Sequence, residues 1–177
     1  MSRGHRRPVS AVNDNLPRAT ETDDCAETTE SMIEVGALGF SAQFTVWSLR
    51  SWVQAFKARA DFGVATGGTF AHFGLTAAAL ALDRMMTVLA AAAARSIDIR
   101  CVPCRYLSPD ERLLVEAVAA AQAENFFLAT VALRKLMPGS AARLALPHAA
   151  DLARDLRAAG MALEAAPEPL PASALLH

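Results

Sequence analysis

The 177-residue sequence lacks most of the features that mark common functional classes. It has only two lysines and one tyrosine, and its formal net charge is −1 at pH 7. So small a net charge creates no overall field that would attract nucleic acid or an anionic membrane. A phosphate-binding loop, a His-Glu-x-x-His zinc motif, a Gly-x-Ser-x-Gly nucleophile turn and an EF-hand loop are all missing from the sequence. These absences predict a protein that is not an enzyme, needs no cofactor and does not bind nucleic acid.

Cysteine is also scarce, with residues only at positions 25, 101 and 104. An odd number of cysteines does not indicate a framework of paired disulfides. The first residues include several arginines where a secretory signal would have an apolar run. We therefore expect the reducing environment of the cytoplasm.

Long apolar runs without charge are absent as well. The most apolar stretches, residues 37–56 and 70–94, contain Arg50 and the pair Asp83 and Arg84, respectively. A charged side chain at the centre of a bilayer costs about 3 kcal/mol or more. We expect both stretches to be buried helices of a water-soluble bundle, with no membrane partner.

What is abundant is alanine, within a hydrophobic content of 53%. Alanine favours helix because its side chain loses no rotational freedom there. Residues 1–29 are polar and residues 165–177 are proline-rich, so neither segment can bury enough apolar surface to offset its ordering entropy. The sequence predicts a disordered tail at 1–29, a helical domain at 30–164 and a second disordered tail at 165–177.

Apolar residues at helical spacing predict an all-α domain, a single bundle of five or six helices. The first helix is expected from about residue 31 to about residue 60, with a break at Gly36 and Gly39. Residues 61–69 are glycine-rich, so they are expected to form a connector between two helices. A very apolar helix is expected over residues 70–95, at the centre of the bundle.

The first helix has two tryptophans, Trp47 and Trp52, on its apolar side. Buried tryptophans are core anchors, whereas an exposed tryptophan is a frequent hot spot for binding a protein partner. We therefore name both as candidate partner-binding residues. The residues expected to face away from this apolar side are Ser48, Arg50, Ser51, Gln54 and Lys57.

The start of the next helix is marked by the run Ser108, Pro109, Asp110 and Glu111. It offers an N-cap serine, a proline at the first helical position and a glutamate that completes a capping box. The sequence therefore predicts a helix that begins directly after Ser108.

The remaining helices are delimited by turn residues. Asn125 precedes a helix that is expected to stop at residues 138–139, which are Pro and Gly. A short helix is expected over residues 140–146. Pro147 is expected to open the last helix, which ends at Gly160.

Residues 97–101 alternate between β-branched and polar side chains and predict a short extended segment. One such segment makes no sheet alone. It either pairs with residues 161–164 or crosses the bundle as an extended linker.

The candidate chemical site is the Cys-x-x-Cys of Cys101 and Cys104, which is flanked by Arg100 and Arg105. Two cysteines at this spacing can chelate zinc or iron, and neighbouring arginines lower thiol pKa values. A zinc site needs further ligands, and only distant residues offer them: Cys25, His72 and His148. Three alternatives stay open: a tight loop without ligand, a metal or iron-sulfur site within one chain or shared across a dimer, and a thiol switch.

The leading hypothesis is a non-enzymatic protein-interaction or regulatory protein that acts through an apolar helical surface on a protein partner or a second copy. The first alternative is a metal-binding or thiol-switch module at Cys101 and Cys104. The second is a DNA-binding regulator, with the N-terminal arginines as a minor-groove arm. Its helix-turn-helix would hold Arg143, Arg154 and Arg157, although Asp151 and Asp155 lie beside them.

Overall fold

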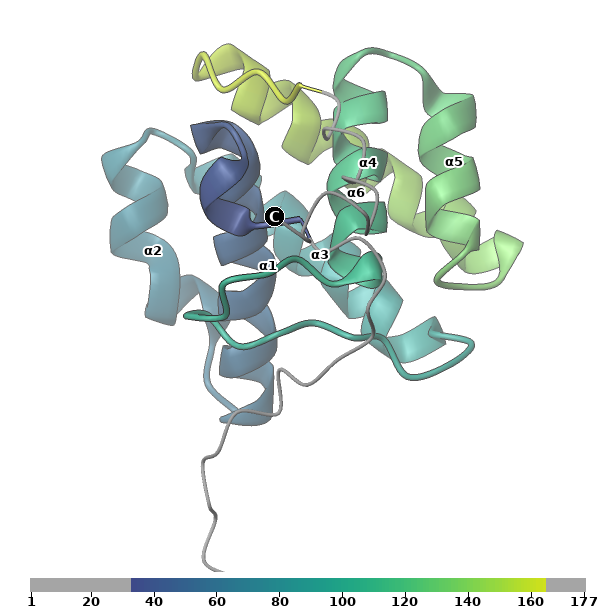
Figure 1. The fold of residues 1–177 in the computed structure, drawn as a ribbon, viewed down its shortest axis with the longest axis horizontal. Helices are drawn as coiled ribbons and strands as arrows, with labels where there is room; N and C mark the ends of the chain where they lie inside the picture. The colour runs from purple at the N-terminus through teal and green to yellow at the C-terminus, as the bar shows by residue number, and fades with distance from the viewer. Residues whose placement is uncertain (1–32, 165–177) are drawn as a thin grey trace, which may run out of the picture.

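The computed structural model describes residues 33–164, which form an all-α domain of six helices without a sheet in that range (Figure 1). The predicted fold class is therefore confirmed. The segments for which we expected disorder, residues 1–29 and 165–177, lie outside the described residues. Cys25 lies outside them too.

A short 3-10 turn precedes the six α-helices, which follow one another along the chain. Their bounds are η1 Val35–Ala37, α1 Phe40–Lys57, α2 Phe62–His72, α3 Thr76–Ala92, α4 Pro109–Gln122, α5 Phe126–Arg134 and α6 Gly139–Ala158. Helices α4 and α5 form a hairpin, α6 crosses behind it along α3, and α1 lies between α2 and α4 (Figure 1). Among the described helices, none has the length and apolarity needed to span a bilayer.

Helix α3 supplies much of the core, as its apolar sequence predicts. Leu82, Met85 and Met86 are all fully buried. Helix α6 packs along it with small side chains, of which Ala145 and Ala149 are fully buried. Small residues on the facing helix let the two backbones approach closely.

The glycine-rich segment 61–69 is helical, so its prediction as a connector is wrong. The side chain of Asp61 caps α2 by accepting the backbone N–H of Val64 at 2.8 Å. One face of α2 is buried, and its buried residues are Phe62, Thr66 and Phe70. Burial of this face outweighs the low helix propensity of the glycines.

The predicted helix over 70–95 is consequently two helices. Its first residues end α2, and the chain turns at Gly74 before α3 begins at Thr76. Gly74 has a φ of 69°, a left-handed conformation that glycine adopts without a steric penalty.

The two predicted helices at 140–146 and after Pro147 form one helix, α6, so this division is wrong. Pro147 lies within α6 and is exposed. The hydrogen bond that its missing N–H would make to Arg143 is therefore lost on the solvent side. The apolar face of α6 continues past Pro147 without a change of register and keeps the helix together.

The predicted helix boundaries at Ser108 and Asn125 are confirmed. Ser108 and Glu111 form a complete capping box at the start of α4. The side chain of Asn125 accepts the backbone N–H of Leu128 at the start of α5.

Residues 97–101 cross the bundle as a linker and do not pair with residues 161–164. A backbone bridge in this part of the chain joins Glu34 to Tyr106, which lies between the linker and α4. Residues 161–164 are held by Gln122, whose side chain donates to the carbonyl of Met161 and accepts the N–H of Leu163. The pairing that we considered for the two segments is therefore wrong.

Candidate functional site

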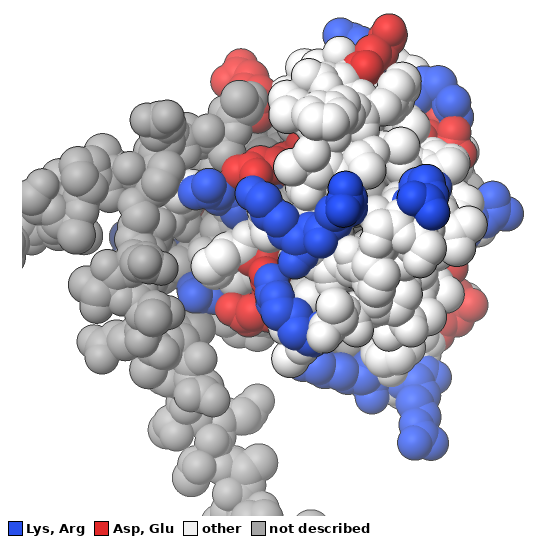
Figure 2. Space-filling model, turned by 90° about the vertical axis from the view of Figure 1, so that its right-hand side faces the viewer, with Lys and Arg blue, Asp and Glu red and all other residues white. Residues whose placement is uncertain are grey.

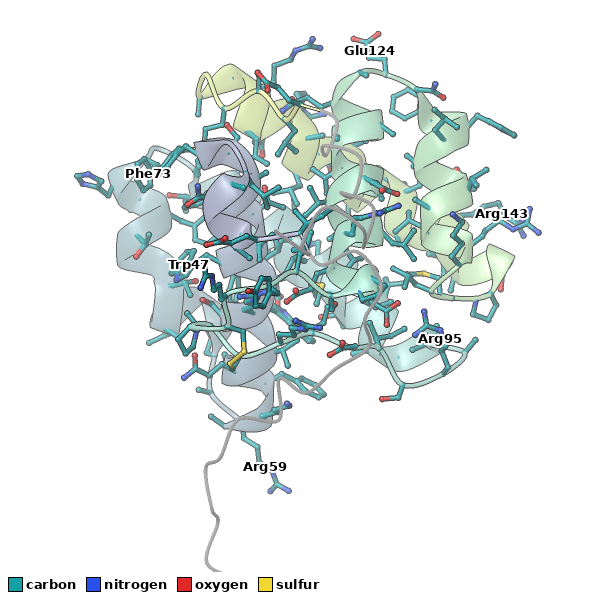
Figure 3. The ribbon with its side chains drawn as sticks, in the orientation of Figure 1. Trp47, Arg59, Phe73, Arg95, Glu124 and Arg143 are labelled. Atoms are coloured by element: carbon teal, nitrogen blue, oxygen red, sulfur yellow. A yellow bond between two sulfur atoms is a disulfide. The ribbon has the colours of Figure 1, made fainter. Side chains whose placement is uncertain are left out.

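The segment between α3 and α4, residues 93–107, passes in front of α1 and returns (Figure 1). It reverses at Cys101 and Cys104, where the N–H of Cys104 donates to the carbonyl of Cys101. The two sulfur atoms are joined in a disulfide, visible as the yellow bond in Figure 3. The Cys-x-x-Cys of the sequence is therefore a closed turn over the surface of α1.

Arg50 of α1 is buried beneath this turn, with 2% of its surface exposed. Its guanidinium pairs with the carboxylate of Glu111, with N–O distances of 2.7 and 2.9 Å. It also donates to the backbone carbonyls of Cys104 and Tyr106. The prediction that this side of the first helix faces solvent is therefore wrong for Arg50, because carbonyls of the segment between α3 and α4 bind its guanidinium. It is also wrong for Ser48 and Ser51, which are buried.

Glu111 is the carboxylate partner of Arg50 and is fully buried. Besides Arg50, its carboxylate accepts the backbone N–H groups of Ser108 and Arg100 at 2.9 and 3.0 Å. A buried ion pair is tolerated where such additional hydrogen bonds satisfy both charges. Arg50 and Glu111 together fix the crossing segment to α1 and α4, and we call them the buried ion pair.

A second ion pair lies at the other end of the crossing segment. Asp110 is buried and accepts hydrogen bonds from both terminal nitrogens of Arg95 and from the backbone N–H of Asp98. Burial by itself raises the pKa of Asp110, but the hydrogen bonds and charge of Arg95 outweigh it and the pKa is lowered. Asp110 therefore remains charged at neutral pH.

The arginines beside the two cysteines are engaged elsewhere. Arg105 pairs with Glu34, with an N–O distance of 2.9 Å, and Arg100 lies 3.9 Å from the carboxylate of Asp98. Within residues 33–164, no three or more His, Cys, Asp and Glu side chains are grouped to hold a metal ion. Metal binding and thiol switching at Cys101 and Cys104 stay predictions.

The two tryptophans lie on opposite sides of α1. Trp47 is half-buried and packs against Phe44 and Phe70, on the side that faces α2 (Figure 3). Trp52 is 6% exposed, and its indole N–H donates to Asp83 at 2.8 Å. Both rings contribute to the packing of the bundle, and their role in partner binding stays a prediction.

A different set of apolar side chains reaches the surface, on α5. Its exposed residues, which we call the α5 face, are Phe126, Phe127, Leu128 and Val131. Phe127 is the most exposed of them, at 77%. Sequence reasoning missed this surface because the helix is apolar all round. Its buried side is made of Ala129, Ala132 and Leu133, so the large side chains point outward.

Charged residues border the α5 face at both ends. Glu124 lies in the turn before α5, and Arg134 and Lys135 lie at its end. Arg143 of α6 lies beside the second half of α5 (Figure 3). None of the four forms an ion pair within the described residues. Figure 2 shows this side of the molecule, where positive side chains gather across a largely uncharged surface.

Comparison with known proteins gives no match. No protein-family model fits the chain, and no curated protein or solved structure is significantly similar to it.

The three arginines considered for a helix-turn-helix, Arg143, Arg154 and Arg157, all lie on α6, which is one continuous helix, so they do not span two helices. The N-terminal arginines of the predicted minor-groove arm lie outside the described residues. Arg154 pairs with Asp151 at 2.7 Å, and Arg157 donates to the carbonyl of Gln122. Of the three, Arg143 is the one without such a partner in the described part of the chain. This arrangement gives the DNA-binding alternative no structural support.

Proposed function

We propose that this chain is a non-enzymatic interaction protein that acts through the α5 face. The observation that carries the proposal is the exposure of four large apolar side chains on one short helix, with Phe127 at 77%. Contiguous exposed apolar patches of this kind mark interaction surfaces, whereas single exposed apolar residues are ordinary. Phenylalanine is also enriched at the centres of protein interfaces.

The partner to which we commit is a second copy of the chain. Along α5 the order is acidic, apolar and basic, from Glu124 through the α5 face to Arg134 and Lys135. Two copies of α5 packed antiparallel would set the apolar residues against each other. They would also bring Glu124 of each copy near the basic end of the other. A two-fold axis requires such a self-complementary surface.

Sedimentation velocity over a range of concentrations tests this association. We expect a concentration-dependent dimer, and we expect Phe127→Ser to shift it to monomer because it removes the most exposed apolar side chain. Val64→Ser is the control, because it also replaces an exposed apolar side chain by serine, and Val64 is 85% exposed but lies on α2. A wild-type chain that stays monomeric at the highest attainable concentration would refute the proposal.

The antiparallel arrangement has its own test. Reversing charge at the basic end, with Arg134→Glu and Lys135→Glu, should weaken the dimer through like-charge repulsion. Adding Glu124→Lys to that variant should restore it, because the pairing is then reversed in sign at both ends. If the added substitution gives no recovery, the antiparallel pairing is wrong even where a dimer forms.

A second candidate role rests on the disulfide between Cys101 and Cys104. We infer that this turn responds to the thiol redox state. A dithiol reductant would supply two electrons and two protons, opening the S–S bond to two thiols. The turn lies on Arg50, which holds its backbone carbonyl at Cys104, so the reduced loop would gain freedom next to the buried ion pair.

Hydrogen exchange of residues 97–107, with and without dithiothreitol, tests this role. We expect faster exchange in the reduced protein, and no effect of dithiothreitol on the variant Cys101→Ser/Cys104→Ser. Equal exchange in both states would exclude the switch. Metal analysis of the reduced protein then tests the remaining alternative, because near-stoichiometric zinc or iron that Cys101→Ser removes would indicate a metal site.

A further inference from the structure

A pocket of about 450 Å³ opens between the end of α1, the start of α2 and α3. None of its lining residues belongs to the α5 face or to the disulfide turn. Its aromatic and polar lining consists of Trp52, Phe56, Phe62, Asp61, Asp83 and Thr87, and alanines complete it. Small-molecule sites are typically clefts of roughly 300 to 1,000 Å³ with apolar walls and a few polar groups.

The aromatic walls are held in place by the core. Trp52 and Phe62 are each 6% exposed, and Trp52 is oriented further by its hydrogen bond to Asp83. Phe56 stacks on Trp52 with ring centroids 5.1 Å apart and is 61% exposed. The pocket is therefore preformed on its inner side and has one accessible ring.

The charge of the pocket is of one sign. Asp83 accepts the indole N–H of Trp52 through Oδ1, and its other carboxylate oxygen has no partner among the described residues. Asp61 accepts the N–H of Val64 through Oδ1. No lysine, arginine or histidine lines the pocket. Two carboxylates with aromatic rings and no cation among the lining residues favour a positively charged ligand.

We propose that this pocket binds a small organic cation, an ammonium group attached to an apolar body. The ammonium would pair with the carboxylate of Asp83. A hydrogen bond between two charged groups is stronger than one between two neutral groups. The aromatic rings attract the same charge through their π faces. The apolar body would occupy the space between Phe56, Phe62 and the alanines of α3.

Isothermal titration calorimetry of the full chain with three probes of similar size tests the charge requirement. The probes are 2-phenylethylamine, 2-phenylethanol and 3-phenylpropionate. We expect the amine to bind at least about tenfold more tightly than the alcohol, and the carboxylate to bind not at all. An alcohol that binds as tightly as the amine, or an amine that does not bind, would overturn the proposal.

The variant Asp83→Asn separates charge from structure. The asparagine side chain still accepts the Trp52 indole N–H, so the fold and the pocket shape are retained. We expect about a tenfold loss of amine affinity and little change for the alcohol. Asp151→Asn is the matched control, because Asp151 lies on α6 and does not line the pocket. Equal amine affinity in Asp83→Asn and wild type would overturn the role of Asp83.

A further titration distinguishes two possible sources of the ammonium group, a free amine and a lysine side chain of a protein partner. The probe is acetyl-Gly-Lys-Gly-amide, which carries the same ammonium group on a peptide. We expect it to bind more weakly than 2-phenylethylamine, because the peptide lacks the aromatic body that fills the pocket. A peptide that binds more tightly than the free amine would overturn the assignment to a small molecule.

Discussion

At the scale of single residues, Arg50 and Glu111 show how a buried charge can be structural. Both side chains are removed from water, which costs several kcal/mol for each ion in a protein interior. Their mutual bond and the hydrogen bonds to five backbone groups offset that cost. The pair joins α1 to the start of α4 and to the segment between α3 and α4.

Arg50→Met tests this balance, because methionine has a similar length and no charge. The substitution leaves Glu111 buried and unpaired, so we expect the free energy of unfolding to fall by about 3 to 5 kcal/mol. Urea unfolding measures the change. The double variant Arg50→Met/Glu111→Gln should lose less than the sum of the two single variants, since no unpaired charge remains. Strictly additive losses would show that the two side chains act independently.

Asp110 is a second residue whose charge is expected to stabilise the fold. Its pKa in the folded state is lowered, chiefly because the bonds from Arg95 outweigh the effect of burial. The unfolded chain therefore binds the proton at a higher pH than the folded chain. The stabilisation is fully present above the ordinary aspartate pKa of about 3.9, and it is lost as the pH falls through the lower folded value.

The difference in unfolding free energy between wild type and Asp110→Asn measures this contribution. We expect it to be constant between about pH 5 and pH 7 and to shrink below about pH 4. Asp151→Asn should show almost no difference at any pH, because the ion pair of Asp151 is exposed and contributes little. A difference for Asp110→Asn that persists at the lowest pH would exclude a charge effect.

At the scale of elements, the sequence predicts those helices whose signals are local. The capping box at Ser108 and the cap at Asn125 are short patterns, and both are confirmed. The buried ion pair is not local, because Arg50 and Glu111 are 61 positions apart. From its polarity we expected Arg50 to face solvent. The sequence pattern within α1 does not show that another segment covers this side chain.

The failures at α2 and α6 have a common physical cause. Glycines and a proline lower helix propensity, but tertiary packing of one apolar face decides whether a helix forms. Phe62 and Phe70 anchor α2, and Leu152 and Leu156 belong to the continuous buried face of α6. The α5 face was missed for a related reason, since an all-apolar helix does not show which side is buried.

Helix α2 retains the cost of its glycines, and this cost is measurable. A Cβ atom at Gly68 would meet no atom within 4 Å. We therefore expect Gly68→Ala to raise the free energy of unfolding by about 0.5 to 1 kcal/mol. Gly74→Ala is the opposite control, because its φ of 69° makes any side chain strained and should lower the stability by about 1 to 2 kcal/mol. A destabilised Gly68→Ala would indicate that α2 is not helical there.

At the scale of the whole molecule, one apolar core unites all six helices, but they do not share it equally. Helices α3, α4 and α6 are buried along much of their length, whereas α2 buries three residues and packs on α1 and α3. Regions with few buried contacts open at a lower free energy than the core. Helix α2 is thus the element expected to separate first from the rest.

Native-state hydrogen exchange tests this hierarchy. We expect the amides of α2 to exchange at least about tenfold faster than those of α3 and α6, because α2 can open while the core stays folded. Gly68→Ala should slow exchange in α2 about two- to fivefold, which corresponds to its expected gain in helix stability. Amides of α3 that exchange only through global unfolding should slow by the same factor, because Gly68→Ala raises the free energy of global unfolding by the same amount. If the amides of α2 and α3 give the same free energy of opening, the bundle unfolds as one cooperative unit. Phe62 and Met85 then become exposed in the same unfolding step.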